Sequence, residues 1–401
     1  MASATWLSTL PRGCRPDPDC ALREPHGLTA SASGSSNSGV DYRVSAEERA
    51  MFKRCRRQWD LGSPHRQNLR AIDHAPSDFD RAVKDALALY YFPGMWDWHS
   101  DIVLPLVGKA FMRTMAASPQ STAEVDRGID LLEQYFAWAP SVDDFCPLKI
   151  ETDVEALVPD VREPERGLVT QTGERVLYTD RVAMLALDGA DECWVVVHDV
   201  VAEWRDTETL LLDEAAVAAC WAWEQTFLGI DLAGTIHNEI LRTAPAPAES
   251  APTRTGTGRP GRGGYSQNEA SGGGRSIPQL PRSERVNSRP ASEDRVKQET
   301  AGVLRRTRIR RSRSEIETSR QQVGTEVLEM LDPALAVYPT PSAAHCPRCI
   351  FRAPCLTMTE GADPAPELAA RFMPGPTRQP FEPRLGAGGA GGRYVPIPPP
   401  T

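Results

Sequence analysis

The chain has 401 residues, 40% of them hydrophobic and 25% charged, with a formal net charge of −9. This length allows one or two hydrophobic cores, and the acidic balance argues against a surface that is basic overall and coats nucleic acid. No apolar run is long enough to cross a bilayer, and the N-terminus lacks the basic and apolar regions of a secretory signal. We therefore expect a cytoplasmic protein with no membrane partner, whose nine cysteines are free or metal-bound rather than disulfide-paired.

Three stretches rich in Pro, Gly and Ser are predicted to be disordered: residues 1–44, 243–302 and 372–401. Their composition is too polar to bury the apolar surface that would offset the cost of ordering the chain. The remainder forms one folded unit in two parts, residues 45–242 and residues 303–371. The middle stretch is then an insertion within that unit.

The first ordered element is predicted to be a helix over residues 45–61, which begins with a capping box at residues 45–48. Phe52, Cys55 and Trp59 share one face of this helix at helical spacing. A lone cysteine at such a position is most simply a small buried side chain. Four basic residues surround it: Lys53, Arg54, Arg56 and Arg57.

Helical periodicity continues over residues 79–117, with a break at residues 92–94, and again over residues 121–138. Five aromatic residues gather around the break. We expect them to pack in the core; the alternative is a platform on which single-stranded bases stack. They are Tyr90, Tyr91, Phe92, Trp96 and Trp98.

The pattern then changes to the period of two that is typical of strands. Turn residues separate the first three predicted strands, which indicates an antiparallel meander. This order predicts an α/β (α+β) fold with a mixed central sheet flanked by helices. The predicted elements are strands over 149–158, 174–187 and 192–201, a helix over 212–228, strands over 231–241 and 304–311, and a helix that Ser312 or Ser314 caps and that reaches Leu331.

The feature most informative about function is a group of three cysteines, Cys346, Cys349 and Cys355, at C-x2-C-x5-C spacing. Three thiolates make an incomplete site, because zinc and iron–sulfur sites normally take four protein ligands. Cys55 is the most economical fourth ligand, and it would tie the first helix to the last loop. With Cys55 or His345 the same trio would also suit zinc in a structural or protein-interaction module.

The order of elements and these cysteines resemble the RecB-like branch of the PD-(D/E)XK nuclease superfamily, which includes CRISPR-associated RecB-like exonucleases and the nuclease domain of AddB. The resemblance covers about residues 45–242 and 303–360. It implies a restriction-endonuclease-like core, an N-terminal helical part and a C-terminal cysteine loop stapled by a 4Fe–4S cluster. The implied cluster ligands are Cys55, Cys346, Cys349 and Cys355.

The resemblance also implies which residues perform the chemistry. Residues 178–182, Tyr-Thr-Asp-Arg-Val, look like the strand that provides an acid, so Asp180 is the implied ligand of Mg²⁺ or Mn²⁺. His198 and Asp199 on the next strand are the implied partners, and His99 resembles an upstream helical histidine. Such a metal ion activates water for phosphodiester hydrolysis. The simpler alternative is that Asp180 and Asp199 are strand-end acids paired with nearby arginines.

One part of the family's pattern is missing. No lysine stands two residues beyond His198 or Asp199, where the family has the cation that lies near the scissile phosphate. Loss of that cation lowers the rate by orders of magnitude unless Arg181 or Arg205 replaces it. The sequence therefore leaves open a working nuclease and a degenerate one retained for binding.

DNA, as single strands or ends, is the expected partner, with a protein of a DNA repair or defence complex as another. Residues 301–322 contain seven Arg and two Glu, and binding through such clusters is strongly dependent on salt. The alternative for this run is a solvated extension of the insertion. The candidate DNA-binding residues are Arg54, Arg56, Arg57, Arg308 and Arg310.

Overall fold

The structure is a computed structural model, and it describes residues 41–72, 79–95, 98–116, 122–163, 166–242 and 295–376. The predictions of disorder for residues 1–44, 243–302 and 372–401 concern mainly residues outside these spans. In the described part of the chain, no helix is both long and apolar enough to span a membrane.

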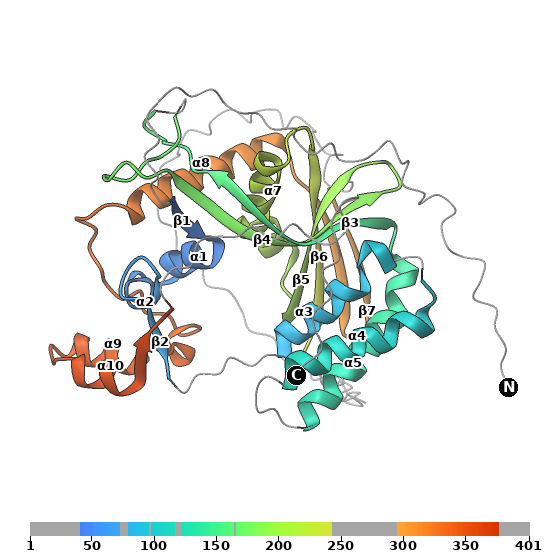
Figure 1. Cartoon of the computed structure of the whole chain (residues 1–401), viewed down its shortest axis with the longest axis horizontal. Coiled ribbons are helices and arrows are strands. Elements are labelled where there is room, and N and C mark those ends of the chain that lie inside the picture. The colour runs from blue at the N-terminus through green and yellow to red at the C-terminus, as the bar shows by residue number, and fades with distance from the viewer. Residues whose placement is uncertain are drawn as a thin grey trace, which may run out of the picture.

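A seven-stranded mixed sheet forms the centre of the molecule (Figure 1). Its strands follow the order β1-β4-β5-β6-β8-β7, and β3 pairs with β4 outside this path. The predicted meander is confirmed, because β3, β4 and β5 pair antiparallel in sequence order. The strands are β1 Tyr42–Ser45, β3 Phe145–Leu157, β4 Val176–Asp188, β5 Cys193–Val201, β6 Leu232–Leu241, β7 Val296–Ala301 and β8 Leu304–Arg310.

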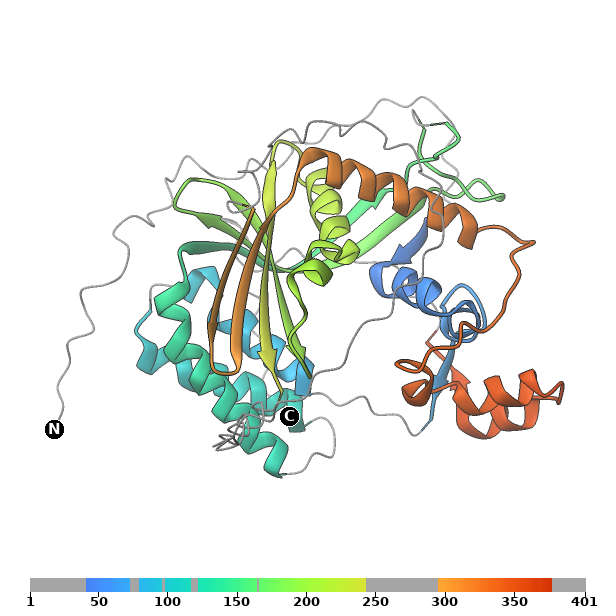
Figure 2. The same cartoon turned by 180° about the vertical axis from the view of Figure 1, so that it is seen from behind.

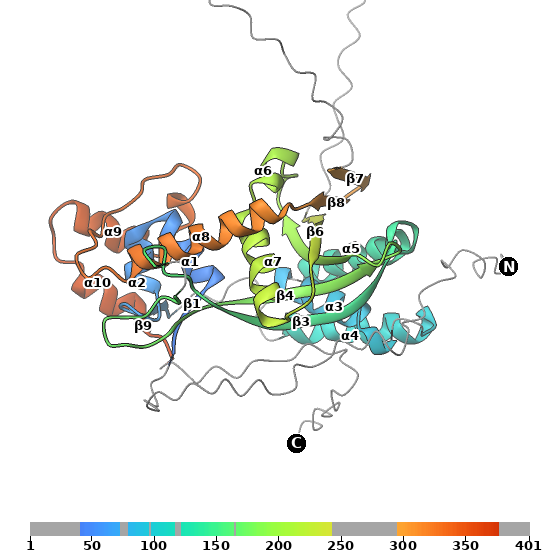
Figure 3. The ribbon, with the colours of Figure 1, turned by 90° about the horizontal axis from the view of Figure 1, so that it is seen from above.

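Helices cover both faces of this sheet (Figure 3). One face carries α3, α4 and α5, and the other carries α1, α7 and α8. The expected mixed sheet flanked by helices is therefore confirmed. The helices are α1 Ala46–Arg54, α3 Phe79–Tyr90, α4 Ser100–Ala116, α5 Thr122–Val142, α6 Thr207–Leu211, α7 Glu214–Thr226 and α8 Arg313–Met330, with a 3-10 turn η1 at Pro93–Met95.

Strand β5 contributes to the cores on both faces of the sheet. Val196 packs in the cluster under α3–α5, whereas Val195 and Val197 belong to the cluster under α7 and α8. Successive side chains of a strand point to opposite faces, so a continuous apolar run is buried on both sides. Beyond this run come two polar residues, His198 and Asp199, before the strand ends at Val201.

The single helix predicted over residues 45–61 is wrong in one respect, because it is broken at Cys55. Ser45 caps α1 as expected, since its hydroxyl accepts a bond from the Glu48 N–H at 3.1 Å. Cys55 is extended, with φ −165° and ψ 114°, and α2 (Arg56–Gly62) starts after it. The break turns the Cys55 thiol toward the C-terminal region, where the Thr340 N–H donates to it.

A small lobe forms at one end of the molecule, apart from α3–α5 (Figures 1 and 2). We call residues 55–72 and 338–376 the cysteine lobe. Its core consists of Leu61, Phe351 and Phe372, and a two-stranded sheet joins its two parts. Its elements are α2, β2 Leu69–Ala71, the 3-10 turn η2 Cys346–Arg348, α9 Arg352–Thr359, α10 Ala365–Arg371 and β9 Phe372–Pro374.

Three short strands lie wholly or mostly where the sequence predicted disorder. β1, at the end of the predicted N-terminal tail, pairs parallel with β4. β7, within the predicted insertion, pairs antiparallel with β8, and Gly302 makes the turn between them with φ 58°. β9, at the start of the predicted C-terminal tail, pairs with β2. β7 contributes backbone hydrogen bonds and no fully buried side chain, whereas β1 and β9 each bury one hydrophobic residue, Val44 and Phe372. Strands this short contain too few residues for a period of two to be recognised in the sequence.

Candidate functional site

The structure brings Cys55 to the C-terminal cysteine trio. Burial raises the pKa of the Cys349 thiol, and the neighbouring thiols of Cys55, Cys355 and Cys346 raise it further. All four are free thiols. Cys55 therefore lies near enough to the trio to influence Cys349 electrostatically, and its role as the fourth ligand stays a prediction. Elsewhere one expectation is corrected, since Cys146 is disulfide-bonded.

Three of the four sulfur atoms accept hydrogen bonds from N–H groups. Thr340 N–H donates to Cys55 Sγ at 3.4 Å, and Ser342 N–H donates to Cys346 Sγ at 3.3 Å. Arg57 donates to Cys355 Sγ at 3.5 Å. A neutral thiol is a weak acceptor, whereas hydrogen bonds to sulfur are a regular feature of thiolate-bound metal centres.

Four cysteine thiolates are ligands suited to a soft metal ion, although their sulfur atoms are not arranged around one point in the described residues. Among the described residues, no group of three or more His, Cys, Asp and Glu side chains is arranged as a metal site. Mutual repulsion raises the pKa of thiols that share a small region, and a bound cation reverses this effect. Four cysteines with N–H donors to three sulfurs match the ligands of both a 4Fe–4S cluster and zinc.

The basic residues beside Cys55 do not form a free patch as a group. Arg57 donates to the Cys355 carbonyl at 3.1 Å, which fastens α2 to α9. Arg56 forms an ion pair with Glu329 and lies over the ring of Tyr338. Arg54 is exposed. Two of these three candidate DNA-binding residues therefore hold the cysteine lobe together.

Asp180 lies on β4 with a largely buried carboxyl group. The Arg181 N–H donates to its Oδ1 at 2.8 Å, and the Tyr178 hydroxyl donates to its Oδ2 at 3.4 Å. Burial raises its pKa to about 6, while these hydrogen bonds and the Arg49 guanidinium act in the opposite direction. A carboxyl group with a raised pKa in a functional region is a typical candidate for a chemical role.

This pKa gives a testable pH dependence. The pKa of this carboxyl group is 3.8 in the unfolded chain and about 6 in the folded protein. Its contribution to the free energy of unfolding is therefore present below pH 4 and is lost as the pH rises through 6. Asp180→Asn, which stays neutral, should match the wild type near pH 4 and be more stable by up to about 3 kcal/mol at pH 7. Denaturant unfolding of both proteins from pH 4 to 8 measures this, and a pH-independent difference would contradict it.

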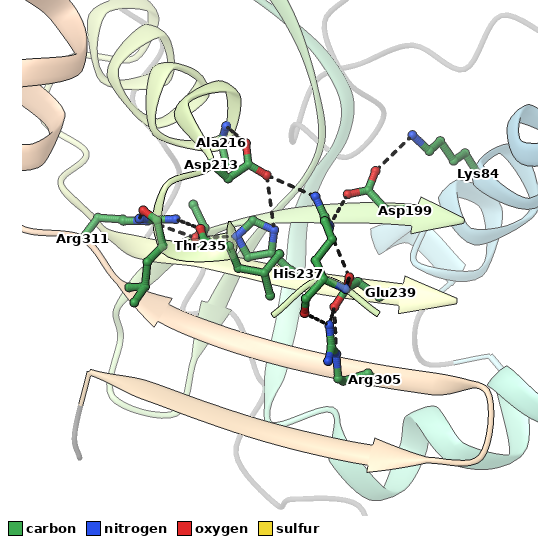
Figure 4. A network of polar contacts seen from close by, with 12 residues as sticks. Lys84, Asp199, Asp213, Ala216, Thr235, His237, Glu239, Arg305 and Arg311 are labelled. Atoms are coloured by element: carbon green, nitrogen blue, oxygen red, sulfur yellow. Dashed lines mark hydrogen bonds and ion pairs between the residues drawn. The ribbon is translucent and has the colours of Figure 1, made fainter. Parts of the chain in front are cut away.

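Asp199, at the end of β5, is paired with two cations (Figure 4). Its Oδ2 accepts a bond from Arg205 Nη2 at 2.6 Å, and its Oδ1 lies 3.6 Å from Lys84 Nζ on α3. Arg205 also pairs with Glu239 at 3.1 Å and with Asp213 at 3.3 Å. A single guanidinium group thus neutralises acids from β5, β6 and the N-terminus of α7.

Asp180 and Asp199 project from the same face of the sheet. Tyr178 and Val182, which flank Asp180 at two-residue spacing, pack under α7, as do Val195 and Val197 before Asp199. β4 and β5 pair only from Leu187↔Cys193 to Met184↔Val196, so both acids lie where the strands have separated. Among the described residues, no hydrogen bond and no shared ion-pair partner joins the two carboxyl groups.

The residues between these acids were missed by the sequence reading. Glu151 on β3 has φ 45°; burial raises its pKa, and the opposing charges include Arg181 and Lys84. Arg181 binds Asp153 through both carboxylate oxygens, at 2.7 and 3.2 Å. A cluster of acids with two cations therefore borders the separated strands. The available signal was an acid at every second position of residues 151–155, but it does not reveal that α3 packs alongside.

The two candidate histidines lie apart from the acids. His198 is buried on the opposite face, stacked on Tyr91 with ring centroids 5.6 Å apart and within 3.2 Å of the Asn238 amide. Burial lowers its pKa to about 3, so it is neutral there. His99 lies at the start of α4, is exposed and faces Asp101 at 3.4 Å. The structure gives neither histidine a contact with Asp180.

The basic strand β8 is integrated into the fold. Arg308 pairs with Asp144 and lies over the ring of Trp194. Arg310 binds both oxygens of Glu192. These residues therefore belong to the folded sheet, and the alternative of a solvated extension of the insertion is wrong for them. Both candidate DNA-binding arginines, Arg308 and Arg310, already have acidic partners.

Comparison with known proteins adds little. No family model matches the sequence, and no curated protein matches it. Among solved structures, a chain titled "Crystal structure of SSO0001" is similar at a TM-score of 0.25 and 8% sequence identity, covering 67% of this chain and 82% of that chain. Likeness at this level supports no conclusion about fold family or function.

Proposed function

We propose that this protein is a RecB-like PD-(D/E)XK nuclease that hydrolyses phosphodiester bonds of DNA, as single strands or ends, with a bound divalent metal ion. The proposal rests on the placement of Asp180 and Asp199, two acids from neighbouring antiparallel strands that share one sheet face where the strands separate. Carboxylate oxygens are the ligands that Mg²⁺ and Mn²⁺ prefer. The restriction-endonuclease-like description of the core is part of this proposal.

The chemistry is a hydrolysis in which the oxygen of water bonds to phosphorus and the phosphorus–oxygen bond to one sugar breaks. The water gives up a proton and the leaving oxygen takes one. A metal ion held by Asp180 and Asp199 would lower the pKa of water and neutralise charge on the phosphate. The chain's own part would be to present the two carboxylates from one sheet face and to favour the ionised form of Asp199 through Arg205.

We further propose that Cys55, Cys346, Cys349 and Cys355 hold a 4Fe–4S cluster, with zinc as the alternative. The support is the convergence of the four thiols and the N–H groups directed at three of them. The role would be structural, because these ligands connect α2 to the C-terminal segment. A cytoplasmic location goes with this proposal, since the thiols must stay reduced.

The nuclease proposal is tested with labelled single-stranded DNA and Mn²⁺. We expect Asp199→Asn to lower cleavage at least about a hundredfold, because a metal ligand supplies several kcal/mol to the transition state. Mn²⁺ binding, measured by calorimetry, should weaken in the same variant. The matched control is Asp231→Asn, since this carboxylate is 93% exposed and pairs only weakly with Arg313 at 3.6 Å. Equal cleavage by both variants would remove Asp199 from the site.

A binding module without catalysis is the second candidate, and one observation favours it. Arg205 already neutralises Asp199, Glu239 and Asp213, and Val201 stands where the family has its lysine. Such a protein would bind DNA, or a protein of a DNA repair or defence complex, and would not cleave. Salt-dependent DNA binding by a wild type that shows no cleavage with Mn²⁺ would favour this candidate.

A further inference from the structure

We infer that Lys84, on helix α3, supplies the cation that contacts the DNA phosphate beside Asp199, in place of the lysine that β5 lacks. This inference rests on the proposed function and deepens it. The strand position two residues beyond Asp199 is Val201, which cannot interact with a phosphate by charge. The missing charge therefore has to come from another element of the fold.

The geometry of Lys84 suits this role. Its Nζ lies 3.6 Å from Asp199 Oδ1, and the side chain reaches Asp199 from α3 at the end of the strand (Figure 4). The ammonium group has three N–H donors, and Asp199 is its one ion-pair partner among the described residues. The side chain is 45% exposed, so the remaining donors are accessible to a phosphate oxygen.

The surrounding acids hold the ammonium group at this place. Burial raises the pKa of Glu151 and of Asp80, and in both cases Lys84 is one of the charges that oppose the rise. Lys84 therefore lies among acids from α3, β3 and β5. β4 and β5 no longer pair beyond Met184↔Val196, which lets a side chain from the α3 face meet Asp199 on the other face.

The two arginines named above as possible replacements, Arg205 and Arg181, are less suitable. Arg205 binds three carboxylates, those of Asp199, Asp213 and Glu239. Arg181 is held by Asp153 through both oxygens. Turning either guanidinium toward a phosphate would leave a partly buried acid without its partner, which costs free energy. Lys84 can contact a phosphate while it keeps its single ion pair.

The test compares Lys84→Met with Lys84→Arg. The matched control is Lys109→Met on α4, an exposed lysine without an ion pair to a described residue. Loss of an exposed ion pair costs at most about 1 kcal/mol, so Lys84→Met should remain folded, and a thermal melt checks this. With Mn²⁺, Lys84→Met should lower kcat about a hundredfold with little change in KM, while Lys84→Arg keeps part of the activity.

A second measurement does not depend on cleavage. In EDTA, the slope of log Kobs for single-stranded DNA against log salt should fall in magnitude by about 0.7 in Lys84→Met, the loss of one phosphate contact. Lys109→Met should keep the wild-type slope. This readout responds to a phosphate contact and not to a purely structural ion pair.

The outcomes separate this inference from the proposed function. An active wild type with an equally active Lys84→Met and an unchanged slope would overturn the inference and leave the nuclease proposal standing. An inactive wild type would overturn the nuclease proposal. In that case a reduced slope in Lys84→Met would still support the phosphate contact, and an unchanged slope would reject it.

Discussion

Cys55→Ala is expected to purify with less than about a tenth of the wild-type metal, because a structural site with three remaining protein ligands is incomplete. The cysteine lobe should also open, since its own core contains only Leu61, Phe351 and Phe372 as buried hydrophobic residues of the described chain. The main sheet has separate cores on its two faces and should stay folded. Metal binding and folding of the lobe are then one event.

The measurement is anaerobic purification with an absorbance spectrum and analysis of iron, sulfide and zinc. Hydrogen exchange in the lobe and in β5 locates the loss of structure. Cys220→Ala is the control, because this thiol is buried in α7 away from the lobe. Iron with sulfide in the wild type supports the cluster, and zinc supports the alternative. Equal metal in Cys55→Ala and the wild type would separate Cys55 from the trio.

Arg306→Met should destabilise the protein by about 3–5 kcal/mol, the usual effect of removing one partner from a buried ion pair. Arg306 and Asp143 are each 4% exposed and are joined at 2.6 Å. Arg306 also donates to Asn238 at 2.7 Å and to the Tyr91 hydroxyl at 3.2 Å. Its loss would leave a buried carboxylate and several acceptors without a donor, which is the expensive part of the change.

The matched control is Arg310→Met on the same strand. Arg310 pairs with Glu192 at the surface, where it is 50% exposed, so its loss should cost at most about 1 kcal/mol. The effect of Arg306→Met should shrink at pH 5, because protonation of the unpaired Asp143 removes the buried charge. Urea unfolding at pH 5 and 7.5 measures both effects. Similar losses in the two variants would contradict the assignment of a buried network to Arg306.

Local sequence patterns were sufficient to predict the elements whose structure depends on residues adjacent in the chain. The β-branched run at residues 195–197 indicated β5, and Ser312 caps α8 through a complete capping box with Glu315. These features depend on a few adjacent residues and on burial of one stripe or face. The mixed sheet with flanking helices followed from the order of such elements.

Distant contacts decided the features that the sequence reading missed. Ser45 correctly marked the start of α1, but the break at Cys55 accompanies a hydrogen bond from Thr340, 285 residues away. β7 depends on β8, because its polar side chains have no core of their own to join. Neither partner can be inferred from the residues on either side.

The arginines of β8 show that the sequence also does not reveal which charged side chains are exposed. Neighbouring arginines look equivalent in the sequence, yet Arg306 is buried against Asp143 whereas Arg310 is half exposed. Arg306 and Arg310 are four residues apart and project from the same face of β8, so alternation does not separate them. Arg306 lies over Trp138 and Phe145 in the core under α3–α5, whereas Arg310 lies at the end of the strand. A count of basic residues therefore overestimates the free charge of this strand.

The features of the candidate sites also separate into those that the sequence determines and those that the tertiary structure decides. The sequence by itself determined the C-x2-C-x5-C trio, the presence of Asp180 and Asp199 on successive strands, and the absence of a lysine two residues beyond Asp199. Only the tertiary structure decided that Cys55 lies near the trio, that both acids share a sheet face, and that Lys84 of α3 lies beside Asp199. Spacing along a chain specifies local geometry, whereas contacts between distant segments depend on how the whole core packs.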